Sequence, residues 1–408
     1  MKLKIMYAPA DATGNGQAIN SQDQAAAKEK LQGQIQSRLV GPETRRELPQ
    51  ASYSGTAGVI PVEIPRDTCV KRIDLEAIIG LTATYAAGSP VYSPQGLFSR
   101  LCPVISIVIN GSRYVKTIQP FMYRVLCAYA FGGFARRAYQ TGAGILSSTR
   151  EPQTEWLSGT IAYPATTQDT VYNESLSIYF ENMFAYGRGA DVTQLYTAGA
   201  SSCWMYFNFV AASNVLNDGN AASVTYSNVS CIVTPTIIEN RQGTPANNAF
   251  DLVETMSDVQ ISAQVSNRAI DLNTGNKLLG LGIMVQNGDT AKTLSDTAVT
   301  KLNLKVNGSQ DLALVNFKNL RNDNKNRYGV SDDQYASGTS AAKGVAWLNL
   351  MKDGDILSGI STRREDGVSQ LQLYIDSASS SGVDPATYTN PVNIKIMQQQ
   401  LVPVPLGQ

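Results

Sequence analysis

Short runs rich in Val, Ile, Thr, Tyr and Phe recur from about residue 50 to the end of the chain, and clusters of Gly, Pro, Asn and Ser separate them. Runs of this length and composition are typical of β-strands bounded by turns. In one of them, LNLKV at residues 302–306, apolar and polar side chains alternate strictly, as in a strand with one buried face. The pattern predicts an all-β chain folded as sandwiches or barrels, with few helices.

Four short segments in the first half of the chain match segments in the second half, in the same order and about 200 residues apart. The pairs are Ile78–Leu81 and Leu278–Leu281, Asn110–Ser112 and Asn307–Ser309, Leu157–Gly159 and Leu357–Gly359, and Leu176–Phe180 and Leu371–Ile375. Such collinear matches are expected from two copies of one domain. The sequence therefore predicts an N-terminal arm (1–49), a first β domain (50–238), a polar linker (239–250) and a second β domain (251–408).

An Asn-Gly pair interrupts two of the strand-like runs, at Asn110-Gly111 and at Asn307-Gly308. Asn-Gly readily supplies the two positive φ angles that a type I′ turn requires. We therefore expect these pairs to form equivalent hairpin turns in the two domains.

The composition limits the possible partners. The chain has 408 residues, enough for two domains of ordinary size. Lys plus Arg and Asp plus Glu both total 33, so no net positive field attracts phosphates, and we expect no direct nucleic-acid binding. The N-terminus lacks the apolar run of a signal peptide and no later stretch has the length of a membrane span, which predicts a soluble chain made in a cytoplasm. Five cysteines without a Cys-x-x-Cys pair predict buried free thiols.

The chain contains no histidine. This excludes Ser-His-Asp and Cys-His nucleophile systems and every zinc site that uses histidine, so we expect no enzyme, no metal and no cofactor. A glycosidase that works with two carboxylates remains open. The candidate carboxylates are Glu174 with Glu181 and Asp332 with Asp333, and the sequence around each pair favours a structural or surface role.

The N-terminal arm is predicted to contain a helix at about residues 22–39, where Ser21 and Gln24 form a capping box. This helix has a single narrow apolar stripe, so it requires a surface to cover that stripe. The arm also carries basic residues that could lie close to a membrane: Lys2, Lys4, Lys28, Lys30 and Arg38. Contact with anionic lipid, packing on a neighbouring subunit and disorder all remain open for the arm.

The chain resembles the double jelly-roll major capsid proteins of tailless icosahedral bacteriophages with an internal membrane, the lineage that includes adenovirus hexon. The resemblance lies in the Gln/Ala-rich helix, in SLSIYFENMFAY followed by a long loop into SCWMYFNFV, and in the closing VNIKIMQQQLV. It implies two upright eight-stranded jelly rolls per subunit, a homotrimeric, pseudo-hexagonal capsomer in a virion shell, and an N-terminal helix at the membrane-facing base. The implied partners are neighbouring capsomers, minor capsid proteins and the inner viral membrane.

A receptor-binding or carbohydrate-binding β-sandwich protein is the alternative, because exposed Tyr and Trp side chains stack on sugar rings. The aromatic residues fall inside apolar strand runs, however, which favours core packing. They are Trp204, Tyr206, Phe207, Tyr179 and Phe180. The two-carboxylate glycosidase is the third choice.

Overall fold

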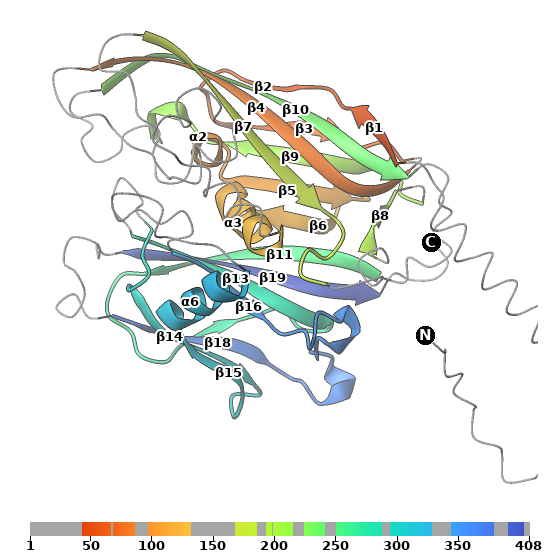
Figure 1. Cartoon of the computed structure of the whole chain (residues 1–408), viewed down its shortest axis with the longest axis vertical. Helices are drawn as coiled ribbons and strands as arrows, with labels where there is room; N and C mark the ends of the chain where they lie inside the picture. The colour runs from red at the N-terminus through yellow and green to blue at the C-terminus, as the bar shows by residue number, and fades with distance from the viewer. Residues whose placement is uncertain are drawn as a thin grey trace, which may run out of the picture.

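Two β sandwiches are stacked one above the other in the computed structural model of the chain (Figure 1). The structure describes residues 43–66, 68–85, 97–131, 168–185, 193–197, 199–214, 224–240, 250–287, 294–328, 344–378 and 391–403. The predicted helix at 22–39 and the basic residues of the arm lie outside these residues. The all-β prediction is confirmed.

Within the described ranges, the first sandwich contains ten strands. They are β1 (Glu43–Glu47), β2 (Ala51–Tyr53), β3 (Gly58–Glu63), β4 (Cys69–Tyr85), β5 (Val104–Ile109), β6 (Arg113–Ile118), β7 (Gln168–Tyr179), β8 (Leu195–Tyr196), β9 (Cys203–Phe209) and β10 (Val224–Asn240). One sheet runs β1/β2, β10, β4, β7, and the other runs β3, β9, β5, β6. Helices α2 (Leu97–Leu101) and α3 (Pro120–Phe131) and the 3-10 turn η2 (Ala212–Asn214) lie in the connections.

The second sandwich repeats this plan. Its strands are β11 (Phe250–Ile261), β12 (Arg268–Asp271), β13 (Lys277–Asn287), β14 (Val299–Val306), β15 (Gln310–Asn316), β16 (Val345–Asn349), β17 (Ile360–Ser361), β18 (Leu371–Ser377) and β19 (Val392–Pro403). The sheets run β11, β19, β13, β16 and β12, β18, β14, β15. Helix α6 (Phe317–Tyr328) and the 3-10 turns η4 (Ile356–Ser358) and η5 (Arg364–Asp366) complete the unit.

Both sandwiches have jelly-roll topology. With β1 and β2 counted as one interrupted strand and the two-residue strands β8 and β17 set aside, each domain has eight strands, paired 1-8-3-6 in one sheet and 2-7-4-5 in the other. That order is the double Greek key of a jelly roll. A strand such as β9 belongs in this fold because its side chains alternate between the core and the outer face. The prediction of two eight-stranded jelly rolls is confirmed.

Repeated hydrogen bonds show that the domains are copies in detail. Thr197 donates its hydroxyl proton to the Thr68 carbonyl oxygen at 2.8 Å, and Thr362 donates likewise to the Asn276 carbonyl oxygen at 2.5 Å. The hairpin of the fourth and fifth strands also has a β-bulge in both domains. It lies between Ile107 and Val108 in the β5–β6 hairpin and between Leu304 and Lys305 in the β14–β15 hairpin. A bulge at one position of both hairpins indicates a common design.

The matched segments are only partly equivalent. Asn110–Ser112 and Asn307–Ser309 occupy the same hairpin turn, and Ile78 and Leu278 lie in the same strand, the third, but at different positions along it. The match of Leu176–Phe180 with Leu371–Ile375 is wrong, because the first segment lies in the sixth strand and the second in the seventh. Residues 157–159 lie outside the described residues. The offset is not constant because the connections differ in length.

The domain boundaries shift slightly from the prediction. Strand β1 pairs with β10 from Glu43↔Asn240 to Glu47↔Thr236, so the first domain includes residues 43–49, which the prediction assigned to the arm. At the join, β10 runs to Asn240 and β11 starts at Phe250. The strands therefore extend into both ends of the predicted linker.

Two apolar clusters form the core. The larger fills the first sandwich and continues onto Leu279, Met284 and Trp347 of the second domain, and the smaller fills the second sandwich. Four of the five cysteines are buried, Cys127 is half-buried, and all five are free thiols. Burial is the main cause that raises the pKa of Cys203 and of Cys231 to about 12.

The Asn-Gly turns have the geometry that a type I′ hairpin requires. The φ angles are 53° and 75° at Asn110 and Gly111, and 51° and 69° at Asn307 and Gly308. Each asparagine side chain also accepts hydrogen bonds from a serine just before the seventh strand. Asn110 Oδ1 accepts from the Ser201 N–H at 2.7 Å, and Asn307 Oδ1 accepts from the Ser369 N–H at 2.9 Å. The turn therefore fixes a neighbouring loop in both domains.

Substitutions at Asn110 separate these two roles. Asn110→Gly keeps the left-handed conformation but removes the acceptor, so it should destabilise the fold by about 1 kcal/mol, whereas Asn110→Asp keeps the acceptor and should cost less. Urea unfolding of the two variants measures the difference. Equal midpoints for Asn110→Gly and the wild type would show that the side chain contributes nothing.

The buried thiols predict a loss of stability at alkaline pH. Folding raises the pKa of Cys203 and Cys231 from an ordinary 9.0 to about 12, so their contribution is complete below pH 9 and is lost as the pH rises toward 12. The free energy of unfolding should therefore fall over this range. A Cys203→Ala/Cys231→Ala variant should show a shallower fall relative to its own value at pH 7, and an unchanged slope would contradict this account.

Candidate assembly surfaces

The two jelly rolls join where strand β6 of the first domain lies beside strand β11 of the second. The two strands run parallel and are bridged at Lys116 and Glu254, which joins one four-stranded sheet of each domain edge to edge. With the short strand β17, the joined sheet has nine strands. We call this junction, with helix α3 above it, the seam. Figure 1 shows it in the middle of the molecule, between the two stacked sandwiches.

A buried ion pair lies at the centre of the seam. Lys116 Nζ is 2.7 Å from Glu254 Oε2, and both side chains are fully buried. The other carboxylate oxygen accepts a hydrogen bond from Gln399 Nε2 at 2.8 Å, and Gln399 Oε1 accepts one from Asn182 Nδ2 at 3.1 Å. Burial lowers the pKa of Lys116, and the Glu254 charge opposes that shift. The network thus ties together strands from both domains, with its charges paired.

Helix α3 closes the seam against the second domain. A Cβ atom on Gly282 would lie 2.9 Å from Leu126 Cδ1, so glycine permits the close approach of this helix to β13. The Tyr129 hydroxyl donates a hydrogen bond to the Val345 carbonyl oxygen at 2.9 Å. Beside the helix, the rings of Phe184 and Trp347 stack with centroids 4.3 Å apart. An Arg113–Asp251 ion pair lies further along the seam.

A second buried ion pair shows that Glu174 is structural. Its carboxylate lies 2.8 Å from Arg124 Nη1 and accepts hydrogen bonds from the backbone N–H groups of Leu97 and Phe98, at 2.7 and 3.1 Å. Glu181 lies 3.7 Å from Lys71 Nζ. A carboxylate held by an arginine and two N–H groups does not have the environment of a catalytic acid, which supports the structural role expected for this residue. Asp332 and Asp333 lie outside the described residues.

The aromatic residues of β9 divide between the two faces of its sheet. Phe207 is in the core, and so is Phe180 after β7, as expected. Trp204 and Tyr206 point to the outer face and are half-buried. Polar side chains share this face, such as Glu63 opposite Trp204, so it mixes apolar and polar groups.

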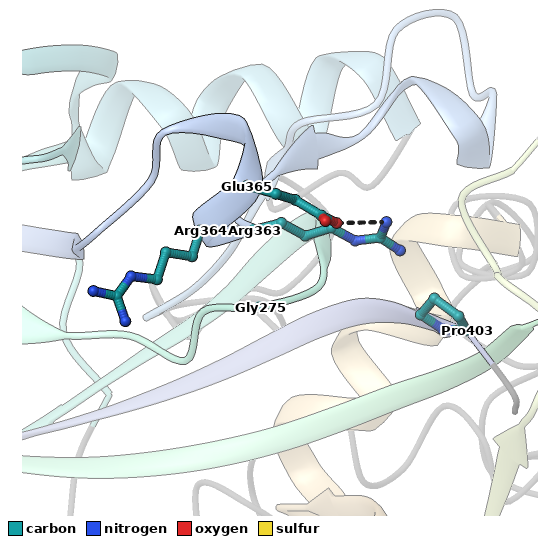
Figure 2. A pocket seen from close by; sticks show the side chains of 5 residues that line it. All are labelled: Gly275, Arg363, Arg364, Glu365 and Pro403. Carbon is teal, nitrogen blue, oxygen red and sulfur yellow. Dashed lines mark hydrogen bonds and ion pairs between the residues drawn. The ribbon is translucent and has the colours of Figure 1, made fainter.

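Figure 2 shows a surface pocket at the end of the second domain, with a volume of about 570 Å³. It is lined by Gly275, Arg363, Arg364, Glu365 and Pro403. Glu365 Oε1 accepts a hydrogen bond from Arg363 Nη1 at 3.3 Å, which neutralises one of the two guanidinium groups, and Arg364 points away from this pair. The pocket therefore has only a weak positive charge.

The structure tests few of the predicted site residues. It places Asn110, Gly111, Asn307 and Gly308 in hairpin turns, while Lys2, Lys4, Lys28, Lys30 and Arg38 lie outside the described residues. No group of three Cys, Asp or Glu side chains within the described ranges could hold a metal ion. None of the helices described has the length and apolar character needed to cross a membrane.

Sequence reasoning missed Lys116 and Glu254. A lysine within the strand-like run RYVKTI and a glutamate within FDLVETM are unusual for buried strands, and this was the available signal. Their pairing was not predictable, because 138 residues separate them in the chain.

The buried pair predicts a clear difference between two variants. Lys116→Met leaves the Glu254 carboxylate buried without its cation and should cost about 3–5 kcal/mol. Lys116→Met combined with Glu254→Gln removes the charge, keeps an acceptor for Gln399 and should recover much of that loss. Urea unfolding measures both, with Lys305→Met as the control, because the Lys305–Asp311 pair is partly exposed and should cost no more than about 1 kcal/mol. Equal midpoints for the single and double variants would contradict this view of the seam.

No protein-family model matches the chain, and no curated protein matches it in sequence. Solved structures do match its fold. The major capsid protein of the Sulfolobus turreted icosahedral virus aligns with a TM-score of 0.54 and 15% identity, over 89% of this chain and 97% of that one. The major capsid protein of bacteriophage PM2 aligns with a TM-score of 0.50 and 12% identity, over 88% and 98%.

A third structure, PBCV-1 VP54 fitted into a reconstruction of the virophage Sputnik, aligns with a TM-score of 0.51 and 12% identity, over 90% of this chain and 95% of that one. In all three cases the alignment covers both jelly rolls and almost the entire solved chain. The likeness that the sequence indicated is therefore confirmed at the level of the fold: the chain has the double jelly-roll fold found in viral major capsid proteins.

Proposed function

We propose that the chain is the major capsid protein of an icosahedral virus, a structural protein of the virion shell without enzymatic activity. The observation that carries this proposal is the match of both jelly rolls, in order, to solved major capsid proteins over nearly their full length. The seam supports it, because a continuous sheet with a buried ion pair makes the two domains one rigid block. A shell subunit needs this rigidity to form the same contacts many times.

The capsomer in this proposal is a homotrimer, in which six jelly rolls form a pseudo-hexagonal block. Two tandem copies of one domain in each chain supply the required pseudo-symmetry, because three chains then present six similar units. Neighbouring capsomers and minor capsid proteins are the further partners. The outer face with Trp204 and Tyr206 is available for such lateral contacts.

The N-terminal arm, residues 1–42, is proposed to act at the base of the shell. Strand β1 starts beside the end of β10, at the pair Glu43↔Asn240, so the described chain begins at one end of the first sandwich (Figure 1). Lys2, Lys4, Lys28, Lys30 and Arg38 would give it up to about 1 kcal/mol each of attraction to anionic lipid close to the surface. Packing on a neighbouring subunit is the other role open to it.

One observation favours the alternative of a carbohydrate-binding sandwich. Trp204 and Tyr206 lie on adjacent outward positions of β9, as in a platform for sugar rings. Both are half-buried, which leaves less ring face for stacking than an open platform needs. A Trp204→Ala variant that loses glycan binding would support this alternative, and unchanged particles without glycan binding would support the capsid.

Removing the arm tests its role separately from that of the domains. Deletion of residues 1–41 spares β1 and should leave a folded trimer of the remaining chain, because the arm precedes the first strand, while shell assembly on the membrane should be impaired. Sedimentation at micromolar concentration measures the trimer, and electron microscopy of lysates measures assembly. A truncated chain that fails to fold or trimerise would place the arm in the core, and normal particles would remove its assembly role.

A further inference from the structure

Strand β15 of the second domain is the counterpart of β6 in the first. Both follow an Asn-Gly-Ser turn, both carry the same bulge, and a helix follows each, α3 after β6 and α6 after β15. Counted from the turn asparagine, Ala313 corresponds to Lys116 and Leu314 corresponds to Thr117. The two strands differ in what covers them: β11 lies beside β6, whereas β15 pairs with β14 alone among the described strands.

The difference in cover changes the burial of equivalent residues. On β6, the exposed fractions are 1% at Val115, 0% at Lys116 and 0% at Ile118. On β15, Leu312, Ala313 and Val315 are only half-buried, and Leu314 is 56% exposed. An apolar strand at the edge of a sheet is ready for pairing with another strand. The second domain thus has the surface of a seam without its partner.

Strand β1 supplies the corresponding backbone edge. It is the counterpart of β11, and its residue Arg45 takes the place of Glu254. The equivalence follows from the residues that pair side by side across each sheet, next to the bulge in the third strand. These residues are Arg45, Ile238, Arg72 and Tyr179 in the first domain. In the second domain they are Glu254, Gln399, Gly280 and Asn349. Glu43, Arg45 and Glu47 are exposed along this edge. Figure 1 shows β1 at one extreme of the stacked sandwiches and β15 at the other.

We propose that β15 of one chain docks beside β1 of a second copy, and so repeats the seam between subunits. The occupant is a second copy because the chain already makes this contact between its own domains, and a head-to-tail contact of this kind closes into a ring when its rotation permits. The repeated seam has Ala313 and Arg45 where the internal seam has Lys116 and Glu254. The repeated seam therefore lacks the buried ion pair, and Arg45, which is exposed on β1, keeps its guanidinium group in solvent beside the contact. This inference rests on the proposed capsomer and specifies its contact.

Two exposed leucines give a matched test. Leu314 is 56% exposed on β15, and Leu357 is 55% exposed on η4, where its carbonyl oxygen accepts a hydrogen bond from Lys277 of the other sheet. Leu314→Arg places a third positive charge beside Arg45 and Arg46 and should convert the trimer into folded monomers near 43.9 kDa in a sedimentation experiment at micromolar concentration. Leu357→Arg should leave the trimer intact. A Leu314→Arg chain that remains trimeric would overturn the proposed contact.

A cross-link tests the register directly. Residues that bridge adjacent strands have Cα separations within the range that a disulfide accepts, so an Arg45→Cys/Ala313→Cys chain should form covalent trimers under mild oxidation, visible on a denaturing gel without reductant. Neither single variant should do so. Trimers in sedimentation without cross-linked chains would overturn this contact but leave the capsomer standing. A wild-type chain that sediments only as a monomer would overturn both.

Discussion

The buried pair between Lys116 and Glu254 is the interaction on which the arrangement of the two domains depends. A lysine and a glutamate with no solvent exposure are tolerable only together, because either charge alone would be buried without compensation. Since one residue belongs to each domain, the two side chains stay paired and buried only while the jelly rolls are in contact. The glutamine and asparagine beside the pair satisfy its remaining hydrogen-bonding groups, so the seam has one well-defined geometry.

Duplication gives the chain two versions of each surface, and the differences between the copies indicate their roles. Elements that stabilise a single jelly roll are repeated nearly unchanged. Examples are the hydroxyl groups of Thr197 and Thr362, which each donate a hydrogen bond to a backbone carbonyl oxygen, and the two Asn-Gly turns. Elements that face another domain have diverged. Lys116 lies in the contact between the two domains, whereas its counterpart Ala313 is half-buried on the edge strand β15. The second domain therefore keeps unpaired the strand edge that the first domain uses for its contact with β11.

Strand composition, turn residues and internal similarity were sufficient to predict the class of fold, the tandem arrangement and the hairpin turns. These features depend on local pattern, which a sequence contains directly. Short matches could not assign strand order, and Leu176–Phe180 was therefore paired with a segment from a different strand. The buried pair and β1's place in the first sheet were missed for a related reason. The partners of Lys116 and Glu43 lie 138 and about 197 residues away, and only the folded chain brings them together.

In the proposed capsomer, each chain supplies two of the six jelly rolls. Electron cryomicroscopy of the purified full-length protein shows whether it does. We predict three chains around a threefold axis, with six jelly rolls of similar outline and with the internal seam and the contact between subunits in equivalent positions. Single chains that do not associate would rule out this capsomer, and so would oligomers in which the two jelly rolls of one chain have separated.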